Sequence, residues 1–299
     1  MVISASVLPG MDNRFGVAST RFAIEGNGGL RLSARRWDAE RARGIVLFAH
    51  GYTAHMGGYA NVLEVLVRKR FHVFAIDHRG HGGSEGKRAS LDRFDDLVDD
   101  FERLTEVARN VFAGLPVFAL GHSMGGLIVV RHALQHQEQL TGMISVSPAL
   151  IVGDHVSDRA VRVLMIASRL LPTLPAIGSG SIVSEAGNGE SSAQEPPVAP
   201  ARDIFSYHGR TRLNLAREMR VGGLDALERM SGLTLPVMFQ HGTSDLITSP
   251  RGSIQAFHKA SSMDRSIELW ERRPHNLLTD DGWEDPMMQV CQWLAERAG

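Results

Sequence analysis

The sequence predicts an α/β fold in which a mostly parallel β-sheet is covered by helices on both faces. Short apolar runs such as residues 44–50 and 71–77 have the length and continuous hydrophobicity of strands that are buried on both sides. Segments with apolar residues at helical spacing lie between these runs, and this alternation is typical of parallel sheets. The runs end in polar or glycine-flanked residues, which would gather at one edge of such a sheet.

The first half of the chain supplies most of the predicted sheet. Residues 21–37 predict two strands joined by a turn that contains glycine and asparagine. We expect Ser90 to be the N-cap of a helix, because apolar residues from Leu91 to Val111 recur at helical spacing after it. The other elements, in chain order, are strands at 44–50, 71–77, 115–121 and 142–148, with helices at 54–70 and 124–139.

The alternation of strands and helices stops after residue 148 and resumes near residue 235. The intervening residues 149–232 contain two helical stretches and no strand pattern, so we expect a helical cap inserted into the sheet domain. Within the cap, residues 178–200 are rich in glycine, serine and proline, which predicts a mobile loop. Strands at 235–242 and 265–270 and helices at 250–260 and 286–298 then complete a core made of residues 18–148 and 233–299.

The composition of the 299 residues is that of an ordinary globular protein, with 43% hydrophobic and 22% charged residues. The net charge of −1 gives no reason to expect nucleic acid as a partner. The single cysteine, Cys291, fits a packing role in a reducing compartment. The N-terminus lacks a signal-peptide pattern and no apolar run reaches the ~18 residues of a membrane span. We therefore expect a cytoplasmic protein, either free or peripheral at a membrane.

Ser123 lies in the stretch GHSMGG, between a predicted strand and a predicted helix. Glycines on both sides of it permit a strained or closely approached backbone. The pattern G-x-S-x-G in this context is typical of a serine nucleophile exposed on a sharp turn, and a purely structural turn is the alternative. We predict that Ser123 is a nucleophile.

A serine nucleophile needs a general base and an acid that orients the base. His275 follows the last predicted strand, and Asp245 follows the strand before it. The chain order Ser…Asp…His is the order found in α/β-hydrolases. We therefore predict a catalytic triad of Ser123, Asp245 and His275.

Other side chains compete for the two supporting roles. For the base, His258 falls inside a predicted helix and His241 lies close to Asp245 along the chain, so both are weaker candidates. Asp77 also ends a strand, but it precedes the serine and lies in a glycine-rich loop. We expect Asp77 to accept hydrogen bonds from backbone N–H groups of that loop.

The developing oxyanion needs two backbone donors, and we expect these to be the N–H groups of Met124 and Tyr52. No metal-binding spacing of histidines and no glycine-rich nucleotide loop follows a strand, so we predict neither a metal nor another cofactor. We expect four further residues near the strand ends and in the cap to bind substrate: His50, Gly51, His122 and Tyr207.

Several stretches together resemble the monoacylglycerol lipase branch of the α/β-hydrolases, often described as serine aminopeptidase S33-like or lysophospholipase. They are HGYTAHMGGY from His50, FAIDHRGHGGSEGKR from Phe74, GHSMGGLI from Gly121, SVSPAL from Ser145 and HGTSDLITSP from His241. The resemblance extends over nearly the whole chain from about residue 18.

This resemblance implies an α/β-hydrolase fold with an eight-stranded sheet and a helical cap. It also implies hydrolysis of one fatty-acyl ester bond in a small glyceride, with the triad and oxyanion residues named above and no metal. We therefore expect a small amphiphilic ester as substrate, and a cap that contacts lipid surfaces transiently. A lysophospholipase, peptidase or acyltransferase that uses the same triad is the alternative.

Overall fold

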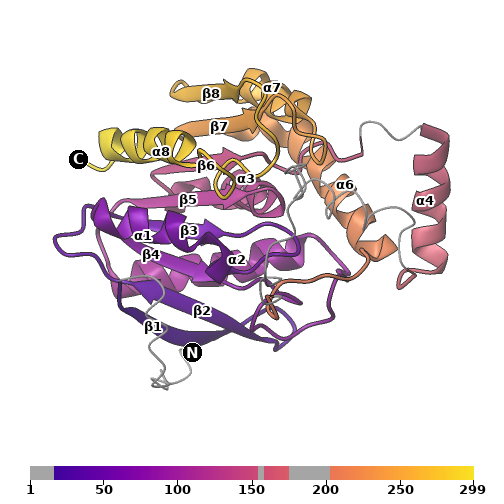
Figure 1. Cartoon of the computed structure of the whole chain (residues 1–299), viewed down its shortest axis with the longest axis horizontal. Helices are drawn as coiled ribbons and strands as arrows, with labels where there is room; N and C mark the ends of the chain where they lie inside the picture. The colour runs from indigo at the N-terminus through magenta and orange to yellow at the C-terminus, as the bar shows by residue number, and fades with distance from the viewer. Residues whose placement is uncertain (1–16, 154–157, 175–202) are drawn as a thin grey trace, which may run out of the picture.

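One sheet of eight strands organises the described part of the chain, which is residues 17–153, 158–174 and 203–299 of a computed structural model (Figure 1). The strand order is β1-β2-β4-β3-β5-β6-β7-β8. The first two strands form an antiparallel hairpin that pairs antiparallel with β4, and all other neighbours are parallel. The predicted α/β fold with a mostly parallel eight-stranded sheet is confirmed.

The strands form where the apolar runs predicted them. Within the central strands every residue is buried, because both faces of a parallel sheet are covered. Their bounds are β1 (Ser19–Glu25), β2 (Arg31–Trp37), β3 (Gly44–Ala49), β4 (Phe71–Ile76), β5 (Val117–His122), β6 (Gly142–Val146), β7 (Val237–Gly242) and β8 (Arg265–Trp270).

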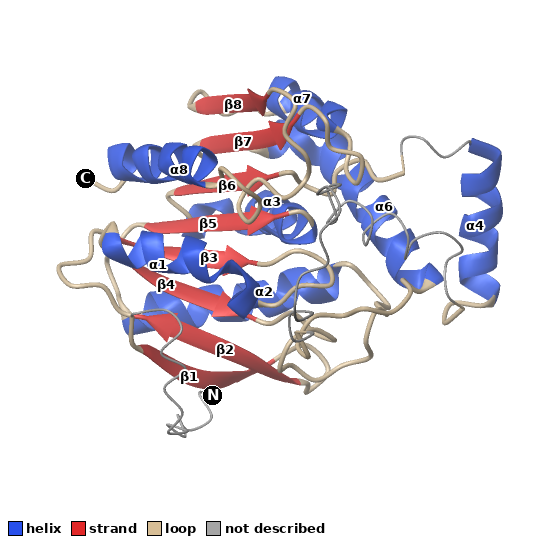
Figure 2. Cartoon of the chain, viewed as in Figure 1, coloured by secondary structure: helices blue, strands red, loops and turns tan. Residues whose placement is uncertain are grey.

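Helices cover both faces of the sheet (Figure 2), and a hydrophobic core lies on each face. Successive side chains of a strand point to opposite faces, so Leu47 of β3 enters one core and Phe48 enters the other. The first core is covered by α2 (Asp95–Val111), α3 (Met124–His136) and α7 (Pro250–Lys259), and the second by α1 (Ala60–Arg68) and α8 (Glu284–Arg297). Cys291 is buried within α8, as a packing role requires.

The helices of the predicted cap lie beyond the carboxyl ends of the central strands in Figure 1. Helix α6 (Leu213–Arg229) packs against α3 and α7, and α4 (Asp158–Leu170) packs against α6. Residues 178–200 lie outside the described residues. Three short 3₁₀ helices complete the described elements: η2 (Met56–Tyr59), η3 (Gln137–Gln139) and η4 (Met230–Gly232). None of the described helices combines the length and the hydrophobicity needed to cross a membrane.

The predicted helix start at Ser90 is wrong. Helix α2 begins at Asp95, with Phe94 at the N-cap position. The Ser90 hydroxyl instead accepts a hydrogen bond from the Asn214 side chain of α6, 2.8 Å away. Leu91 and Phe94 are buried all the same, so their apolar spacing reflects packing of the loop before the helix rather than an additional helical turn.

Candidate active site

Three strands bring the predicted triad residues to one edge of the sheet. Ser123 directly follows β5, Asp245 follows β7 and His275 follows β8. These strands are parallel, so their carboxyl ends meet at the same edge. His275 lies within hydrogen-bonding distance of both Ser123 and Asp245, although 122 and 30 residues separate the three along the chain (from 123 to 245 and from 245 to 275).

The turn at Ser123 is sharp and strained. Its φ of 58° and ψ of −117° lie in a region that side-chain-bearing residues rarely adopt. The surrounding glycines are needed because a Cβ on Gly121 would overlap the Gly125 carbonyl, and one on Gly125 would overlap the Ala49 carbonyl. The glycines thus let β5, α3 and β3 pack closely around the strained turn at the start of α3.

A continuous chain of hydrogen bonds links the three side chains. The Nδ1 atom of His275 lies 2.6 Å from Oδ2 of Asp245, and its Nε2 lies 2.8 Å from Oγ of Ser123. An ionised carboxylate only accepts hydrogen bonds, so the proton of neutral His275 is on Nδ1. Its Nε2 is then free to accept the Ser123 hydroxyl proton. All three residues are buried.

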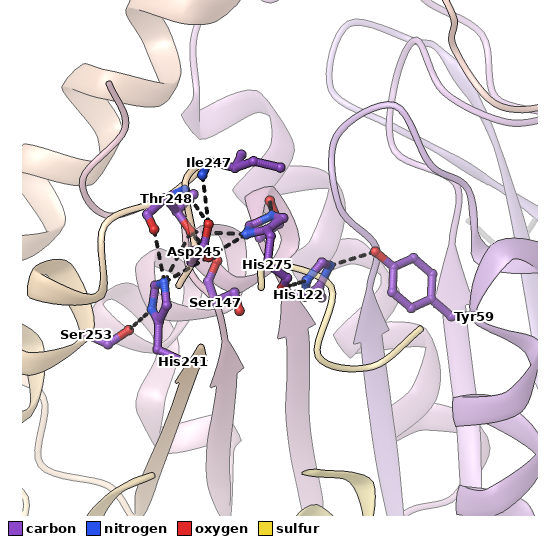
Figure 3. Close-up of polar contacts among 10 residues, drawn as sticks. Tyr59, His122, Ser147, His241, Asp245, Ile247, Thr248, Ser253 and His275 are labelled. Carbon is purple, nitrogen blue, oxygen red and sulfur yellow. Dashed lines mark hydrogen bonds and ion pairs between the residues drawn. The ribbon is translucent and has the colours of Figure 1, made fainter. Parts of the chain in front are cut away.

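Asp245 is held as an anion by its surroundings. Its Oδ1 accepts the backbone N–H groups of Ile247 and Thr248, at 2.8 and 2.9 Å. Burial opposes ionisation, yet the hydrogen bonds from His241 and His275 outweigh it and hold the pKa of the Asp245 carboxyl well below its usual range. A permanent negative charge therefore faces Nδ1 of His275 (Figure 3).

The two predicted oxyanion donors belong to segments that adjoin the nucleophile. Met124 is the first residue of α3, so its N–H has no partner within the helix. Tyr52 follows Gly51, where a Cβ atom would lie 3.3 Å from Cβ of Ser123. Burial raises the pKa of Tyr52 to about 12. Its ring packs edge-on against His81, with 5.7 Å between ring centroids.

The imidazoles of His50 and His122 form hydrogen bonds within the protein at both ring nitrogens. The His50 Nδ1–H donates to the Gly51 carbonyl at 2.8 Å, and its Nε2 accepts the His78 backbone N–H at 3.0 Å. The His122 Nε2–H donates to the His275 carbonyl at 3.1 Å, and its Nδ1 accepts the Tyr59 hydroxyl at 2.8 Å. Both rings are buried and engaged at both nitrogens, so they hold neighbouring loops in place, and a contact with substrate stays a prediction.

Gly51 and Tyr207 remain near the site. The Gly51 N–H donates to the Tyr59 hydroxyl at 3.2 Å, which ties this loop to the His122 network. The Tyr207 N–H donates to the Thr53 carbonyl at 2.8 Å, and its ring centroid lies 6.4 Å from that of Tyr52. The segment that leads into α6 is thereby attached to the predicted oxyanion loop.

The competing side chains occupy other roles. Asp77 accepts the backbone N–H of Gly83 in its own loop at 2.8 Å and that of Met56 in η2 at 2.9 Å, which confirms the prediction that it accepts hydrogen bonds from backbone N–H groups. His258 is exposed on α7. His241 contacts Asp245, and the described residues show no hydrogen bond between His241 and Ser123. Among the described residues, no group of three or more His, Cys, Asp or Glu side chains could hold a metal ion.

Tyr59 and Thr248 are site residues that the sequence did not single out. Tyr59 anchors His122, and the Thr248 hydroxyl lies 2.9 Å from Oδ2 of Asp245. The spacing offers one usable signal: a hydroxyl residue three positions after an aspartate is well placed for a turn closed by that carboxylate. Tyr59 carries no comparable signal, because its contact with His122 spans 63 residues.

The fold and the serine, aspartate and histidine at the carboxyl ends of its strands define an α/β-hydrolase. Comparisons with known proteins agree. The profile of the family described as "serine aminopeptidase, S33" matches residues 40–282. A monoacylglycerol lipase of Mycolicibacterium smegmatis is 30% identical over 283 residues, which cover 93% of this chain and 98% of that relative. The human monoglyceride lipase is 28% identical over 277 residues, which cover 90% of this chain and 88% of the relative.

A solved structure shares the fold. The crystal structure of Paleococcus ferrophilus monoacylglycerol lipase aligns with a TM-score of 0.73 at 24% identity, over 89% of this chain and 99% of that one. Because the family profile spans residues 40–282, the present chain belongs to the serine aminopeptidase S33 family of α/β-hydrolases. It is a carboxylic ester hydrolase of the monoacylglycerol lipase-like kind.

Proposed function

We propose that the chain is a serine hydrolase that cleaves carboxylic esters through an acyl-enzyme. Monoacylglycerols, or similar esters with medium or long acyl chains, are the proposed substrates. The observation that carries the proposal is the unbroken series of hydrogen bonds from Ser123 through His275 to Asp245, at 2.8 and 2.6 Å. This geometry fits a nucleophile, a general base and an orienting acid.

In the acylation step, Oγ of Ser123 attacks the ester carbonyl carbon while its proton passes to Nε2 of His275. Asp245 stabilises the imidazolium that forms. The carbonyl oxygen becomes an oxyanion, which the N–H groups of Tyr52 and Met124 are proposed to bind, each worth about 3 kcal/mol. The imidazolium then protonates the leaving alcohol oxygen, the carbon–oxygen bond breaks, and the acyl group remains on the serine.

In the deacylation step, water takes the place of the alcohol. His275 removes a proton from the water as its oxygen attacks the acyl carbon, and a second oxyanion forms at the same donors. Collapse of this intermediate returns the proton to Oγ of Ser123 and releases the fatty acid. No metal or organic cofactor takes part in the proposed cycle.

The substrate class is supported by the relatives named as monoacylglycerol and monoglyceride lipases. It is tested by measuring hydrolysis of glycerol monoesters with acyl chains from two to eighteen carbons, together with the matching triesters. We expect the highest kcat/KM for monoesters of medium or long chains. Activity confined to acetyl esters would contradict the glyceride assignment and leave the serine mechanism intact.

The alternatives use the same nucleophile on other acyl compounds. A peptidase needs an acid to bind a free amine, but the Glu218 carboxylate accepts the Phe94 N–H at 3.0 Å and pairs with Arg217 at 2.8 Å. Glu185, the other acidic residue considered for binding a free amine, lies outside the described residues. Lysophospholipid and aminoacyl amide substrates in the same panel distinguish these activities, and an added alcohol acceptor detects acyl transfer.

We also propose that the insertion contacts lipid surfaces transiently during substrate uptake. Val163, Ile166 and Leu170 of α4 are exposed apolar side chains, and such groups bind the interfacial region of a bilayer. Flotation with phosphatidylcholine vesicles tests this contact. We expect weak association that an Ile166→Ser, Leu170→Ser double variant abolishes, and equal flotation of both proteins would contradict it.

A further inference from the structure

A second imidazole contacts the carboxylate that orients His275. Nε2 of His241 lies 3.0 Å from Oδ2 of Asp245, and the two side chains are fully buried. Figure 3 shows Asp245 between His241 and His275, so that the carboxylate joins two imidazoles. The mechanism described above uses only one of them.

The hydrogen-bond partners of His241 fix where its proton lies. Its Nε2 faces two acceptors, Oδ2 of Asp245 at 3.0 Å and the backbone carbonyl of Thr248 at 3.2 Å, so Nε2 carries a proton. Its Nδ1 lies 2.7 Å from Oγ of Ser253 on α7. In the neutral ring Nδ1 is an acceptor, and the Ser253 hydroxyl donates to it. His241 is therefore an oriented donor to the carboxylate.

Counting lone pairs shows that both imidazoles have a place at Oδ2. An oxygen accepts two well-directed hydrogen bonds, and His275 and His241 supply two. The Thr248 hydroxyl lies 2.9 Å from Oδ2 and 3.1 Å from the Ser147 carbonyl, and its single proton serves one of them at a time. Donation to the Ser147 carbonyl leaves both lone pairs of Oδ2 to the imidazoles. Oδ1 is already occupied by two backbone N–H groups. The carboxylate cannot rotate without losing several of these bonds.

We propose that His241 is a positioning residue for the reaction, which fixes Oδ2 of Asp245 and disperses its charge, and thereby sets the pH at which His275 becomes protonated. The proposal rests on the proposed function for the role of His275 as general base. A donor to a carboxylate weakens the attraction of that carboxylate for a neighbouring cation. Without the donor, imidazolium at His275 persists to higher pH and the base is lost sooner on acidification.

Other ionisable groups also face this site. His122 of β5 donates to the His275 carbonyl, and Asp280 in the following loop interacts electrostatically with His275. Both remain unchanged in every variant described below. A difference between a variant and the unaltered protein therefore does not arise from the loss of His122 or Asp280.

Two substitutions of His241 distinguish the effect of losing the hydrogen-bond donor from the effect of altered packing. His241→Gln places an amide N–H near the position of Nε2 and keeps the donor, whereas His241→Leu fills similar space without one. His132→Leu is the matched control, because His132 is equally buried and bonds to a carboxylate, Glu102, at 2.6 Å, between α2 and α3. Far-UV circular dichroism and thermal unfolding establish that each variant is folded.

The deciding measurement needs no substrate. The low-field NMR resonance of the His275 Nδ1 proton is titrated with pH in each protein. We expect the midpoint in His241→Leu to rise by about one pH unit, the shift that corresponds to about 1.4 kcal/mol, and to stay in place in His241→Gln and His132→Leu. An unchanged midpoint in folded His241→Leu, or the same rise in the His132 control, would overturn the proposal.

A measurement on the unaltered protein covers the case in which His241→Leu does not fold. Nitrogen-15 NMR of its histidines at neutral pH should show His241 as the Nε2–H tautomer. A His241 ring protonated only at Nδ1 would overturn the proposal, because it could not donate to Asp245. The milder Ser253→Ala variant removes the hydroxyl that fixes this tautomer, and we expect a smaller rise of the midpoint in the same direction.

Kinetics provide the last readout. We expect His241→Leu to lower kcat for a medium-chain ester by about 10- to 100-fold with little change in KM, and to move the acidic limb of the pH–rate profile upward, with recovery in His241→Gln. If the unaltered protein hydrolyses no ester, the proposed function fails. The two NMR results still decide the role of His241.

Discussion

The candidate active site and helix α4 differ in burial, in hydrogen bonding and in packing. Ser123 and Asp245 are 8% and 7% exposed, and their polar atoms are engaged in hydrogen bonds. Val163 and Leu170 of α4 are 66% and 74% exposed, although they are apolar. The site is enclosed by two hydrophobic cores and several strands, whereas α4 makes its main helix contact with α6.

This difference indicates that the catalytic side chains are tightly constrained by packing and that α4 is not. The chemistry depends on three side chains held by a close-packed sheet edge, where small displacements break hydrogen bonds. Helix α4 has no comparable constraint, so its sequence can change with little cost to the fold. We therefore expect substitutions at the site to alter turnover, and substitutions on α4 to alter the acyl-chain preference and the contact with lipid surfaces.

The largest effect should come from the nucleophile. Ser123→Ala removes the attacking oxygen and should lower kcat for a medium-chain ester by roughly 10⁵- to 10⁶-fold. Because alanine also fits the site sterically, the thermal unfolding midpoint should change little. Activity within about 10-fold of the unaltered protein would place the chemistry elsewhere.

The next largest effect should come from the orienting acid. Asp245→Asn keeps the size of the side chain, but its amide favours the wrong tautomer of His275, so kcat should fall by about 10⁴-fold. His258→Gln, on an exposed part of α7, is the control and should leave kcat unaltered. Equal activity of the two variants would show that the carboxylate beside His275 has no role.

Acid should lower the free energy of unfolding through buried groups of the core, and α4 should contribute nothing to this pH dependence. Burial lowers the pKa of His50, His81 and His122 to about 3 from 6.5. Between these pH values the unfolded chain binds more protons than the folded chain, so the free energy of unfolding falls as the pH falls. Asp245, whose folded pKa is depressed, adds a loss below its ordinary carboxyl range.

Thermal unfolding at pH 7, 5.5 and 4 measures this dependence. The midpoint should fall by at least several degrees, roughly the change that 1–2 kcal/mol produces in a chain of this size. The Val163→Ser, Leu170→Ser double variant should follow the same curve, because no buried histidine lies on α4 among its described side chains. A constant midpoint between pH 7 and 4 would contradict the buried neutral state of these imidazoles.

The smallest effect should come from α4 itself. The same double variant should keep its free energy of unfolding within about 0.5 kcal/mol, as exposed substitutions usually do. Its kcat/KM for acetyl esters should be unaltered, and that for long-chain esters should fall by roughly 3- to 10-fold as apolar contact is lost. An equal loss for short and long esters would mean that α4 acts on the chemistry.

The sequence predicted the sheet because continuous apolar runs leave few alternatives for a buried strand. It predicted the meeting of Ser123, Asp245 and His275 because parallel strands share a carboxyl edge. The helix start at Ser90 was wrong because burial produces the same apolar spacing in a packed loop. A local pattern cannot separate these two cases.

The finer structure of the site depends on contacts that no pattern encodes. His50 and His122 lie beside glycines at strand ends, which suggested a ligand pocket, but both nitrogens of each ring are used within the protein. Tyr59 could not be found at all, since its partner is distant along the chain. His241, four residues before Asp245, was visible in the sequence only as a rival base.

The most direct test of the account is to locate the acyl group during turnover. The protein is mixed with an activated medium-chain ester, quenched in acid within milliseconds, and digested for peptide mass spectrometry. We predict one acylated peptide, which contains Ser123, and no adduct in Ser123→Ala. An acyl group on another residue, or rapid turnover without an adduct on the serine, would contradict the proposed mechanism.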